Sequence, residues 1–277
     1  MLVFPNCKIN LGLHVVNKRP DGYHAIETVL YPLGWHDALE IIEGKDRHRP
    51  FAFEQSGRRI DGPQENNLVY KAWKIISQEK KCPPVSVHLY KNIPMGAGLG
   101  GGSSDAVYFI NALDQKFELG LSQETKIRIV SGLGSDCAFF IKNLPVFAVG
   151  KGDEFTGMDI DLSGYYILAV HPSIHSNTKE AYEGLAPGSP AYDLKAVIAQ
   201  KPVRAWKDLV VNDFEASLFK KHPEIKALKD QLYAAGALYA SMSGSGSAVF
   251  GIFEKDPNLH FPTNYSYCLQ KPAMGIL

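Results

Sequence analysis

The chain has 277 residues, of which 45% are hydrophobic and 21% charged, so it is long enough for two domains with buried cores. Lys and Arg together number 29, as do Asp and Glu, and the formal net charge of zero argues against a nucleic-acid partner. No apolar run is long enough for a membrane span, and the first residues do not have the pattern of a signal peptide. Four scattered cysteines without a C-x-x-C pair favour a reduced, cytoplasmic protein.

The predicted elements mix strands and helices without a regular alternation. Period-two patterns predict strands over residues 2–16 (with a break at 5–7), 25–33, 38–43, 85–93, 165–170 and 248–253. Helical spacing and capping residues predict helices over residues 68–79, from 103, from 122, and over 194–199, 214–219 and 224–235. This order favours an α+β fold. Turn residues at 150–153 indicate a domain boundary soon after, which we expect between residues 157 and 158.

The most informative segment is Pro94–Ser104, which has five glycines between a predicted strand and a predicted helix. Glycine permits positive φ and close backbone approach, and a helix N-terminus attracts anions, so the segment predicts a phosphate-binding loop. Ser103 and Ser104 add hydroxyls for a phosphate or for Mg²⁺. The alternative is a flexible surface loop. It is disfavoured because ordering five glycines costs conformational entropy, and a loop without a ligand would gain nothing to offset that cost.

Two known glycine motifs do not fit this loop. The spacing G-x-G-x-x-G over Gly96, Gly98 and Gly101 matches a dinucleotide fingerprint, but the loop lies in mid-domain rather than in a first βαβ unit. No G-K-[ST] follows, so the loop is not a Walker P-loop. It indicates phosphate without identifying the enzyme.

Two further segments gain meaning beside this loop. Ser241–Ser247 alone could be a hairpin, and Pro5–Leu11 alone could be an edge strand. In order around P-x-G-x-G-L-G-G-G-S-S, however, they resemble the superfamily of galactokinase, homoserine kinase, mevalonate kinase and phosphomevalonate kinase. Within it the chain is most similar to the 4-diphosphocytidyl-2-C-methyl-D-erythritol kinases of the non-mevalonate isoprenoid pathway. The motifs that carry the resemblance are Lys8-Ile9-Asn10-Leu11, Asp21-Gly22-Tyr23-His24, Glu65-Asn66-Asn67-Leu68, residues 93–104, Gly134-Ser135-Asp136 and Ser243-Gly244-Ser245-Gly246.

The resemblance implies a two-domain kinase. Residues 1–157 would form an ATP-binding and catalytic domain like ribosomal protein S5, and residues 158–277 a ferredoxin-like substrate domain. The reaction would be ATP-dependent, Mg²⁺-dependent phosphorylation of the 2-hydroxyl of 4-diphosphocytidyl-2-C-methyl-D-erythritol. The partner would thus be a small cytidine-diphosphate alcohol, and the protein a monomer or homodimer.

The same resemblance implies roles for single residues. Asp136 would accept the hydroxyl proton, and Lys8 would lie near it and stabilise charge. Asn10 would bind the substrate or orient that pair, while Tyr23 and His24 would recognise cytosine and Tyr182 would supply an opposite stacking ring. Gly244 and Gly246 would support the substrate diphosphate or the glycine loop. ATP would be bound by Asn67, Lys91, Pro94, Gly96, Gly98, Leu99, Gly100, Gly101, Gly102, Ser103 and Ser104, with Ser104 also the metal contact.

Each role has an ordinary alternative. Asp136 could cap a helix, Lys8 could be an exposed strand lysine, Tyr23 and His24 could close a turn, and Lys91 could lie on the surface. Relatives usually have Ala in place of Cys7 and often Pro in place of Ala138, so the backbone that presents Asp136 would be less fixed here.

Three other functions compete with this prediction. Another alcohol kinase of the superfamily, acting on homoserine, mevalonate or a sugar, would not need Tyr23 and His24. A nucleotide-binding regulator without catalysis would not need both Lys8 and Asp136. A dinucleotide oxidoreductase comes third, on the glycine spacing alone.

Overall fold

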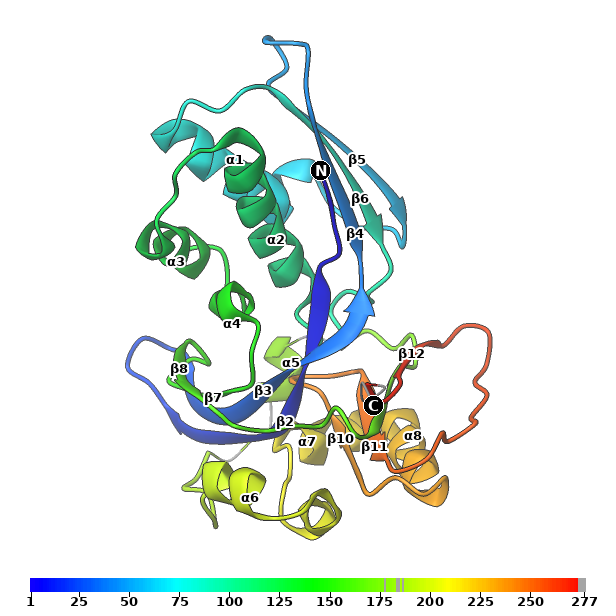
Figure 1. The fold of residues 1–277 in the computed structure, drawn as a ribbon. Coiled ribbons are helices and arrows are strands. Elements are labelled where there is room, and N and C mark those ends of the chain that lie inside the picture. Colours follow the sequence, from blue (N-terminus) through cyan, green and yellow to red (C-terminus); the bar gives the residue numbers. More distant parts are fainter. Residues whose placement is uncertain (177, 183–184, 186, 274–277) are drawn as a thin grey trace. The chain divides into compact units, whose positions relative to one another are not determined.

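The structure is a computed structural model, and it describes residues 1–176, 178–182, 185 and 187–273 (Figure 1). The chain divides into two compact units, each built from several stretches of sequence. The first unit comprises Met1–Cys7, Trp35–Met95 and Gly100–Asn143. The second comprises Lys8–Gly34, Gly96–Leu99 and Leu144–Leu277.

The first unit is a sheet with helices on one face. Its strand order is β1 (Leu2–Val3), β4 (Ala38–Glu43), β6 (Val85–Lys91), β5 (Phe51–Gly57), with β5 and β6 parallel and the other pairs antiparallel. Figure 1 shows α1 (Leu68–Glu79) and α2 (Gly101–Phe117) beside this sheet, with α3 (Gln123–Ser131) and α4 (Cys137–Lys142) following. A short 3-10 helix, η1 (Gln64–Asn66), precedes α1.

Strand β6 shows why this sheet holds a core. Val85, Val87 and Leu89 alternate toward the buried face, as expected when side chains of a strand point to opposite faces in turn. The same alternation directs Lys91, the last residue of the strand, into the interior.

The second unit contains two sheets. The first has the order β2 (Asn6–Lys18), β3 (His24–His36), β7 (Val146–Val149), β8 (Glu154–Gly157). The second is antiparallel, with the order β10 (Tyr239–Met242), β11 (Val249–Phe253), β9 (Tyr166–His171), β12 (Ser266–Gln270). The other elements are α5 (Thr178–Tyr182), α6 (Leu194–Gln200), η2 (Val203–Asp208), α7 (Phe214–Lys221) and α8 (Pro223–Ala234).

The second of these sheets has ferredoxin-like topology. Numbered along the chain from β9, its strands lie in the order 4-1-3-2, and α7 and α8 connect the first strand to the second. Residues 254–265, all of them described, form no helix where a ferredoxin-like fold has its second crossover. Apolar side chains of α7 and α8, such as Leu218 and Leu228, pack with Val170 and Val249 of the sheet. The predicted α+β class is confirmed.

Most predicted elements are present, with shifted ends. The helix predicted over 68–79 has those bounds, and the side chain of its N-cap Asn67 accepts a hydrogen bond from the Val69 amide at 2.8 Å. The elements that were not predicted include the strands β5, β7, β8, β10 and β12 and the helices α4 and α5. The boundary predicted between residues 157 and 158 does not coincide with the two units, because β2 and β3 belong mainly with the C-terminal half.

Candidate active site

The glycine-rich loop has the backbone conformation that its sequence predicts. Gly96, Gly98 and Gly100 have φ of 61°, 75° and 69°, values that residues with a side chain rarely adopt. Helix α2 begins at Gly101, two residues earlier than predicted, and its N-cap Gly100 has no side chain to cap it. The first N–H groups of α2, which have no partner within the helix, can therefore donate to an anion.

Ser104 adds a buried hydroxyl to this helix start. Its Oγ has no hydrogen-bond partner among the described residues, and its side chain is fully buried. Next to it, Gly102 faces open space, since nothing lies within 4 Å of the point where a Cβ would be. Buried hydroxyls without partners are uncommon, so this hydroxyl and the free amides suit the oxygens of a polyphosphate or a hydrated Mg²⁺.

The first part of the loop is held by contacts within the second unit. The Lys8 amide donates to the Leu99 carbonyl at 3.0 Å, and the Ala248 amide donates to the Ala97 carbonyl at 3.2 Å. The Ser243 hydroxyl donates to the Gly98 carbonyl at 2.8 Å. The loop is therefore tied to β2 and to the Gly-Ser turn before β11, two segments far apart in the sequence.

Lys8 and Asn10 form a buried pair on β2. Both are 3% exposed, and Lys8 Nζ donates to Asn10 Oδ1 at 2.7 Å. Asn10 Nδ2 in turn donates to Thr28 Oγ1 at 3.0 Å. The alternative of an exposed strand lysine is wrong, because Lys8 is buried. A buried ammonium needs hydrogen-bond partners, and Asn10 supplies one. Thr28, which lies on the neighbouring strand β3, was not predicted from the sequence.

The turn that carries Gly244 and Gly246 lies against this pair. A Cβ on Gly244 would be 3.3 Å from both Asn10 Oδ1 and the Gly98 carbonyl oxygen. The side-chain amide of Asn212 donates to the carbonyls of Met242 and Gly244, each at 2.8 Å. Asn212 and Ser243 thus shape the turn, and neither was predicted from the sequence to belong to the site.

Asp136 lies in the first unit, in the turn before α4. It occupies the N-cap position but makes no capping hydrogen bond with its side chain, so the capping alternative is not supported. A Cβ on Gly134, two residues earlier, would be 3.7 Å from Ser103 Oγ in the first turn of α2. The turn with Asp136 is therefore adjacent to the start of α2. Burial raises the pKa of the neighbouring Cys137 to about 11, so that thiol stays neutral.

The aromatic residues predicted to bind a base lie in the second unit. The rings of His24 and Tyr182 stack with centroids 4.4 Å apart and planes at 16°. Tyr23 is 62% exposed, and Lys151 Nζ lies 5.3 Å from the centroid of its ring. A planar ligand can thus reach Tyr23, whereas it cannot lie between His24 and Tyr182 until their rings separate. Asn177, in the segment before Tyr182, lies outside the described residues.

Two residues expected at the adenine pocket are engaged elsewhere. Lys91 is 1% exposed, and its ammonium forms ion pairs with Asp37 and, at 2.8 Å, with Asp105. An ammonium enclosed in this way does not line a surface pocket, so the side-chain role predicted for Lys91 needs correction. The side chain of Asn67 caps α1 by accepting a hydrogen bond from the Val69 amide, so its carbonyl oxygen is already engaged within the helix.

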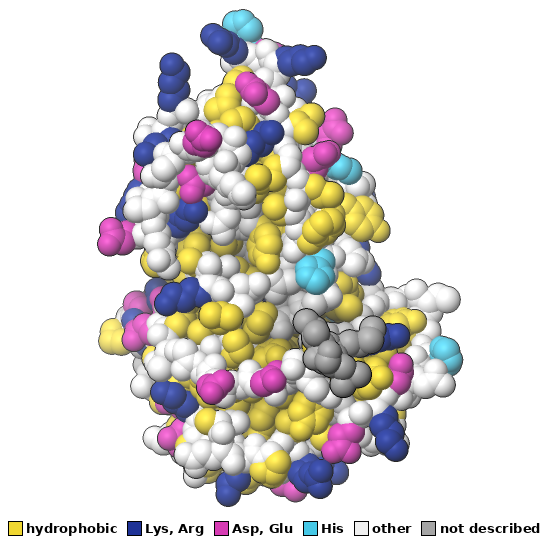
Figure 2. Space-filling view, viewed as in Figure 1, with side chains coloured by type: hydrophobic (Ala, Val, Ile, Leu, Met, Phe, Trp, Pro, Cys, Tyr) yellow, Lys and Arg dark blue, Asp and Glu magenta, His cyan; other side chains and the backbone are white. Residues whose placement is uncertain are grey.

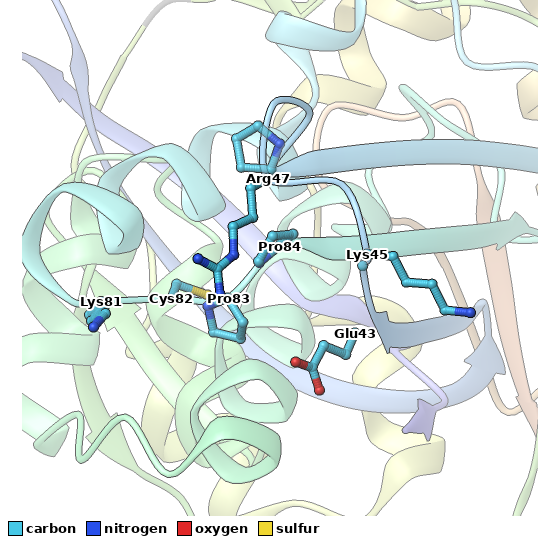
Figure 3. A pocket seen from close by; sticks show the side chains of 9 residues that line it. Glu43, Lys45, Arg47, Lys81, Cys82, Pro83 and Pro84 are labelled. Atoms are coloured by element: carbon cyan, nitrogen blue, oxygen red, sulfur yellow. The ribbon is translucent and has the colours of Figure 1, made fainter.

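A cavity of about 910 Å³ lies at the end of β4 and the start of β6. Lys45, Arg47 and Lys81 line it together with Glu43, and Figure 3 shows them around the Cys82–Pro84 segment. No residue predicted for the site lines this cavity.

Across the face in Figure 2, basic and acidic side chains are interspersed, in keeping with the zero net charge. In the part of the chain that the structure describes, no cluster of three His, Cys, Asp or Glu side chains could hold a metal, and no helix is long and apolar enough to cross a membrane.

Comparison with known proteins identifies the family. The GHMP kinases N terminal domain matches residues 67–144, and the GHMP kinases C terminal domain matches residues 194–259. A 4-diphosphocytidyl-2-C-methyl-D-erythritol kinase of Bacteroides fragilis is 47% identical over 273 residues, which cover 98% of each chain. The chain belongs to the 4-diphosphocytidyl-2-C-methyl-D-erythritol kinase family. It is therefore an ATP-dependent small-molecule kinase.

Solved structures agree with this membership. A crystal structure of 4-(cytidine 5'-diphospho)-2C-methyl-D-erythritol kinase has a TM-score of 0.78 and 28% identity, covering 91% of this chain and 90% of its own. Homoserine kinase from Cytophaga hutchinsonii has a TM-score of 0.63 at 17% identity, covering 90% and 85%. The second likeness concerns the fold alone, so the fold does not distinguish between acceptor alcohols.

Proposed function

We propose that this family member transfers the γ-phosphoryl group of ATP to the 2-hydroxyl of 4-diphosphocytidyl-2-C-methyl-D-erythritol, a step of the non-mevalonate isoprenoid pathway. The observation that carries the proposal is the 47% identity to a kinase named for this substrate, over 98% of both chains. The presence of the pair Tyr23-His24 adds support, since kinases for simple alcohols have no base to recognise.

ATP binding would use the glycine-rich loop and the start of α2. The positive φ of Gly96, Gly98 and Gly100 lets backbone amides face phosphate oxygens, and the uncapped helix start favours their negative charge. Mg²⁺ would neutralise the bridging phosphate charge when bound. The buried hydroxyl of Ser104 fits a role as its protein contact, with water completing the coordination.

Asp136 and Lys8 would supply the chemistry of transfer. Asp136 would hold the proton that the 2-hydroxyl loses on attack, and the ammonium of Lys8 would stabilise the negative charge that develops. Asn10 accepts from Lys8 at 2.7 Å, which supports an orienting role for Asn10. Phosphoryl transfer requires mainly positioning and charge stabilisation, so such a small set of groups suffices.

Cytosine would be recognised by the aromatic residues. Tyr23 offers an exposed ring for stacking, and His24 offers one ring nitrogen as donor and the other as acceptor for the polar edge of the base. Tyr182 would stack on the base after leaving His24. We further propose that the protein is a monomer or homodimer and that it is cytoplasmic. The four free cysteines support the cytoplasmic location.

The test is ADP release with ATP and one alcohol at a time: 4-diphosphocytidyl-2-C-methyl-D-erythritol, homoserine and mevalonate. We expect turnover with the cytidine-diphosphate alcohol alone, and CDP should inhibit it competitively. Turnover with homoserine or mevalonate instead would refute the substrate assignment. ATP binding without turnover of any alcohol would favour a regulatory protein.

A further inference from the structure

A cluster of three charged side chains is enclosed within the first unit. Lys91, Asp37 and Asp105 are 1%, 1% and 2% exposed, and Lys91 Nζ donates to Oδ2 of both carboxylates. Burying charges is costly, and replacing such a cluster by apolar groups often leaves a protein equally or more stable. Stability alone therefore does not account for the cluster, and its position in the fold gives a better reason.

Asp37 holds the chain where it enters the glycine-rich loop. Its Oδ1 accepts hydrogen bonds from the amides of Asn92 at 2.6 Å and Ile93 at 2.8 Å, the two residues before Pro94. The other oxygen of Asp37 binds Lys91, at the end of β6. Both oxygens of this carboxylate thus accept hydrogen bonds from the three consecutive residues 91–93.

Asp105 and Lys91 hold the chain where it leaves the loop. Asp105 lies in the second turn of α2 and receives a hydrogen bond of 2.8 Å from Lys91 Nζ. A Cβ on Gly101 would lie only 2.9 Å from the same Nζ, so the ammonium packs directly against the first residue of the helix. The lack of a side chain at Gly101 makes room for it.

We propose that Lys91 is a positioning residue for nucleotide binding. By binding both Asp37 and Asp105, it sets the distance between the chain that enters the glycine-rich loop and the helix α2 that follows the loop. Lys91 would act without touching ATP, by fixing the direction in which the first amides of α2 face the phosphates. The ligand concerned is the triphosphate of a nucleotide, so the inference rests on the proposed function.

The test compares Lys91→Met with the wild type in the full-length protein. Removing groups that orient binding residues typically costs roughly 10–100-fold, so we expect KM for ATP to rise by that factor. KM for the cytidine-diphosphate alcohol should stay near the wild-type value. Hydrogen exchange should become faster at residues 94–104 and stay unchanged in β9 and β11.

A matched control separates positioning from general destabilisation. Ile76→Ala removes a fully buried side chain of α1 in the same unit and should lower the melting temperature without touching the loop. If Ile76→Ala raises KM for ATP as much as Lys91→Met does, the positioning role is wrong. If Lys91→Met does not fold, Asp105→Asn provides the test, because it keeps the shape of the side chain and the pair between Lys91 and Asp37.

Measured at about pH 8, where Asp105 is ionised, Asp105→Asn should raise KM for ATP and speed exchange around residues 100–105, and no change in either would overturn the proposal. Calorimetric binding of a non-hydrolysable ATP analogue gives the same comparison without an acceptor alcohol. The proposal can therefore fail while the substrate assignment stands, and the substrate assignment can fail while this proposal stands.

Discussion

The carbonyl oxygen of Ser243 occupies the space that a side chain on Gly98 would need. Gly98 also has φ of 75°, so Gly98→Ala would be strained in its backbone and would displace the turn at Ser243. Because misplacing reacting groups by an ångström can cost about 10²-fold, we expect kcat/KM to fall by at least about that factor. Steady-state kinetics and thermal melting measure the effect.

Gly157→Ala is the control for Gly98→Ala. Gly157 lies in β8 and has nothing within 4 Å of the position of a Cβ, so the variant should keep wild-type kinetics. Wild-type activity in Gly98→Ala would contradict the packing described for the loop and the Gly-Ser turn.

Replacing Asp136 with Asn should separate catalysis from binding. Loss of a general base costs typically about 10²–10⁴-fold, so we expect kcat to fall by that range while calorimetry finds ATP affinity near normal. Asp230→Asn changes an exposed carboxylate that pairs with Lys226 and should leave kcat unchanged. Equal turnover of Asp136→Asn and the wild type would exclude a catalytic role for Asp136.

The proposed joint action of Lys8 and Asp136 can be tested by combining variants. Groups that act as a unit in one step lose far less together than the product of their single effects. We expect kcat for the double variant Lys8→Met/Asp136→Asn to be close to kcat for the less active of the two single variants. Fully multiplicative losses would mean that the two residues contribute independently.

The stack of His24 and Tyr182 predicts a specific change in substrate affinity. Stacking of a base on an aromatic ring is worth about 1–3 kcal/mol, so Tyr182→Ala should raise KM for the cytidine-diphosphate alcohol by roughly 5–150-fold. KM for ATP should not change, and Tyr182→Phe should behave like the wild type. A lower KM for the alcohol in Tyr182→Ala would mean instead that Tyr182 covers His24 and competes with the base.

The buried cluster predicts a pH dependence of stability. Burial raises the pKa of Asp105 from 3.8 to about 7; Asp37 adds to the rise, and Lys91 opposes it. Between these two values the folded protein binds more protons than the unfolded chain, so the contribution of Asp105 to stability is present at low pH and is lost as the pH rises through about 7.

Asp105→Asn removes this titration and gives the measurement. From about pH 5 to about pH 8, the melting temperature of the wild type should fall relative to that of Asp105→Asn. Parallel curves for the two proteins would show that Asp105 does not titrate in this range.

The sequence predicts local features of the site better than distant contacts. The glycine loop and the Asn67 cap follow from neighbouring residues, because backbone freedom and capping act over a few positions. Ser243, Asn212 and Thr28 were missed because their partners lie far away in the sequence. The separation is 145 residues between Ser243 and Gly98, and no periodicity signals such a contact.

Lys91 is a different kind of error, since its setting could have been found. The alternation of Val85, Val87 and Leu89 already directs position 91 to the core face, where a lysine requires a buried acidic partner. The prediction followed the resemblance to the family and gave the residue to the nucleotide. Strands such as β10 and β12 were missed because they are short and lack a clear alternation.

The chain passes between its two units after residues 7, 34, 95, 99 and 143, and this has a practical consequence for chimeras with related kinases. A single crossover near residue 157 would join strands β2 and β3 of one parent to β9–β12 of the other. Asn10 of the first parent would then have to fit Ser243 of the second, and Leu13 would have to fit Val211. Exchanging acceptor preference between relatives should therefore require grafting residues 8–34 and 96–99 together with the C-terminal half.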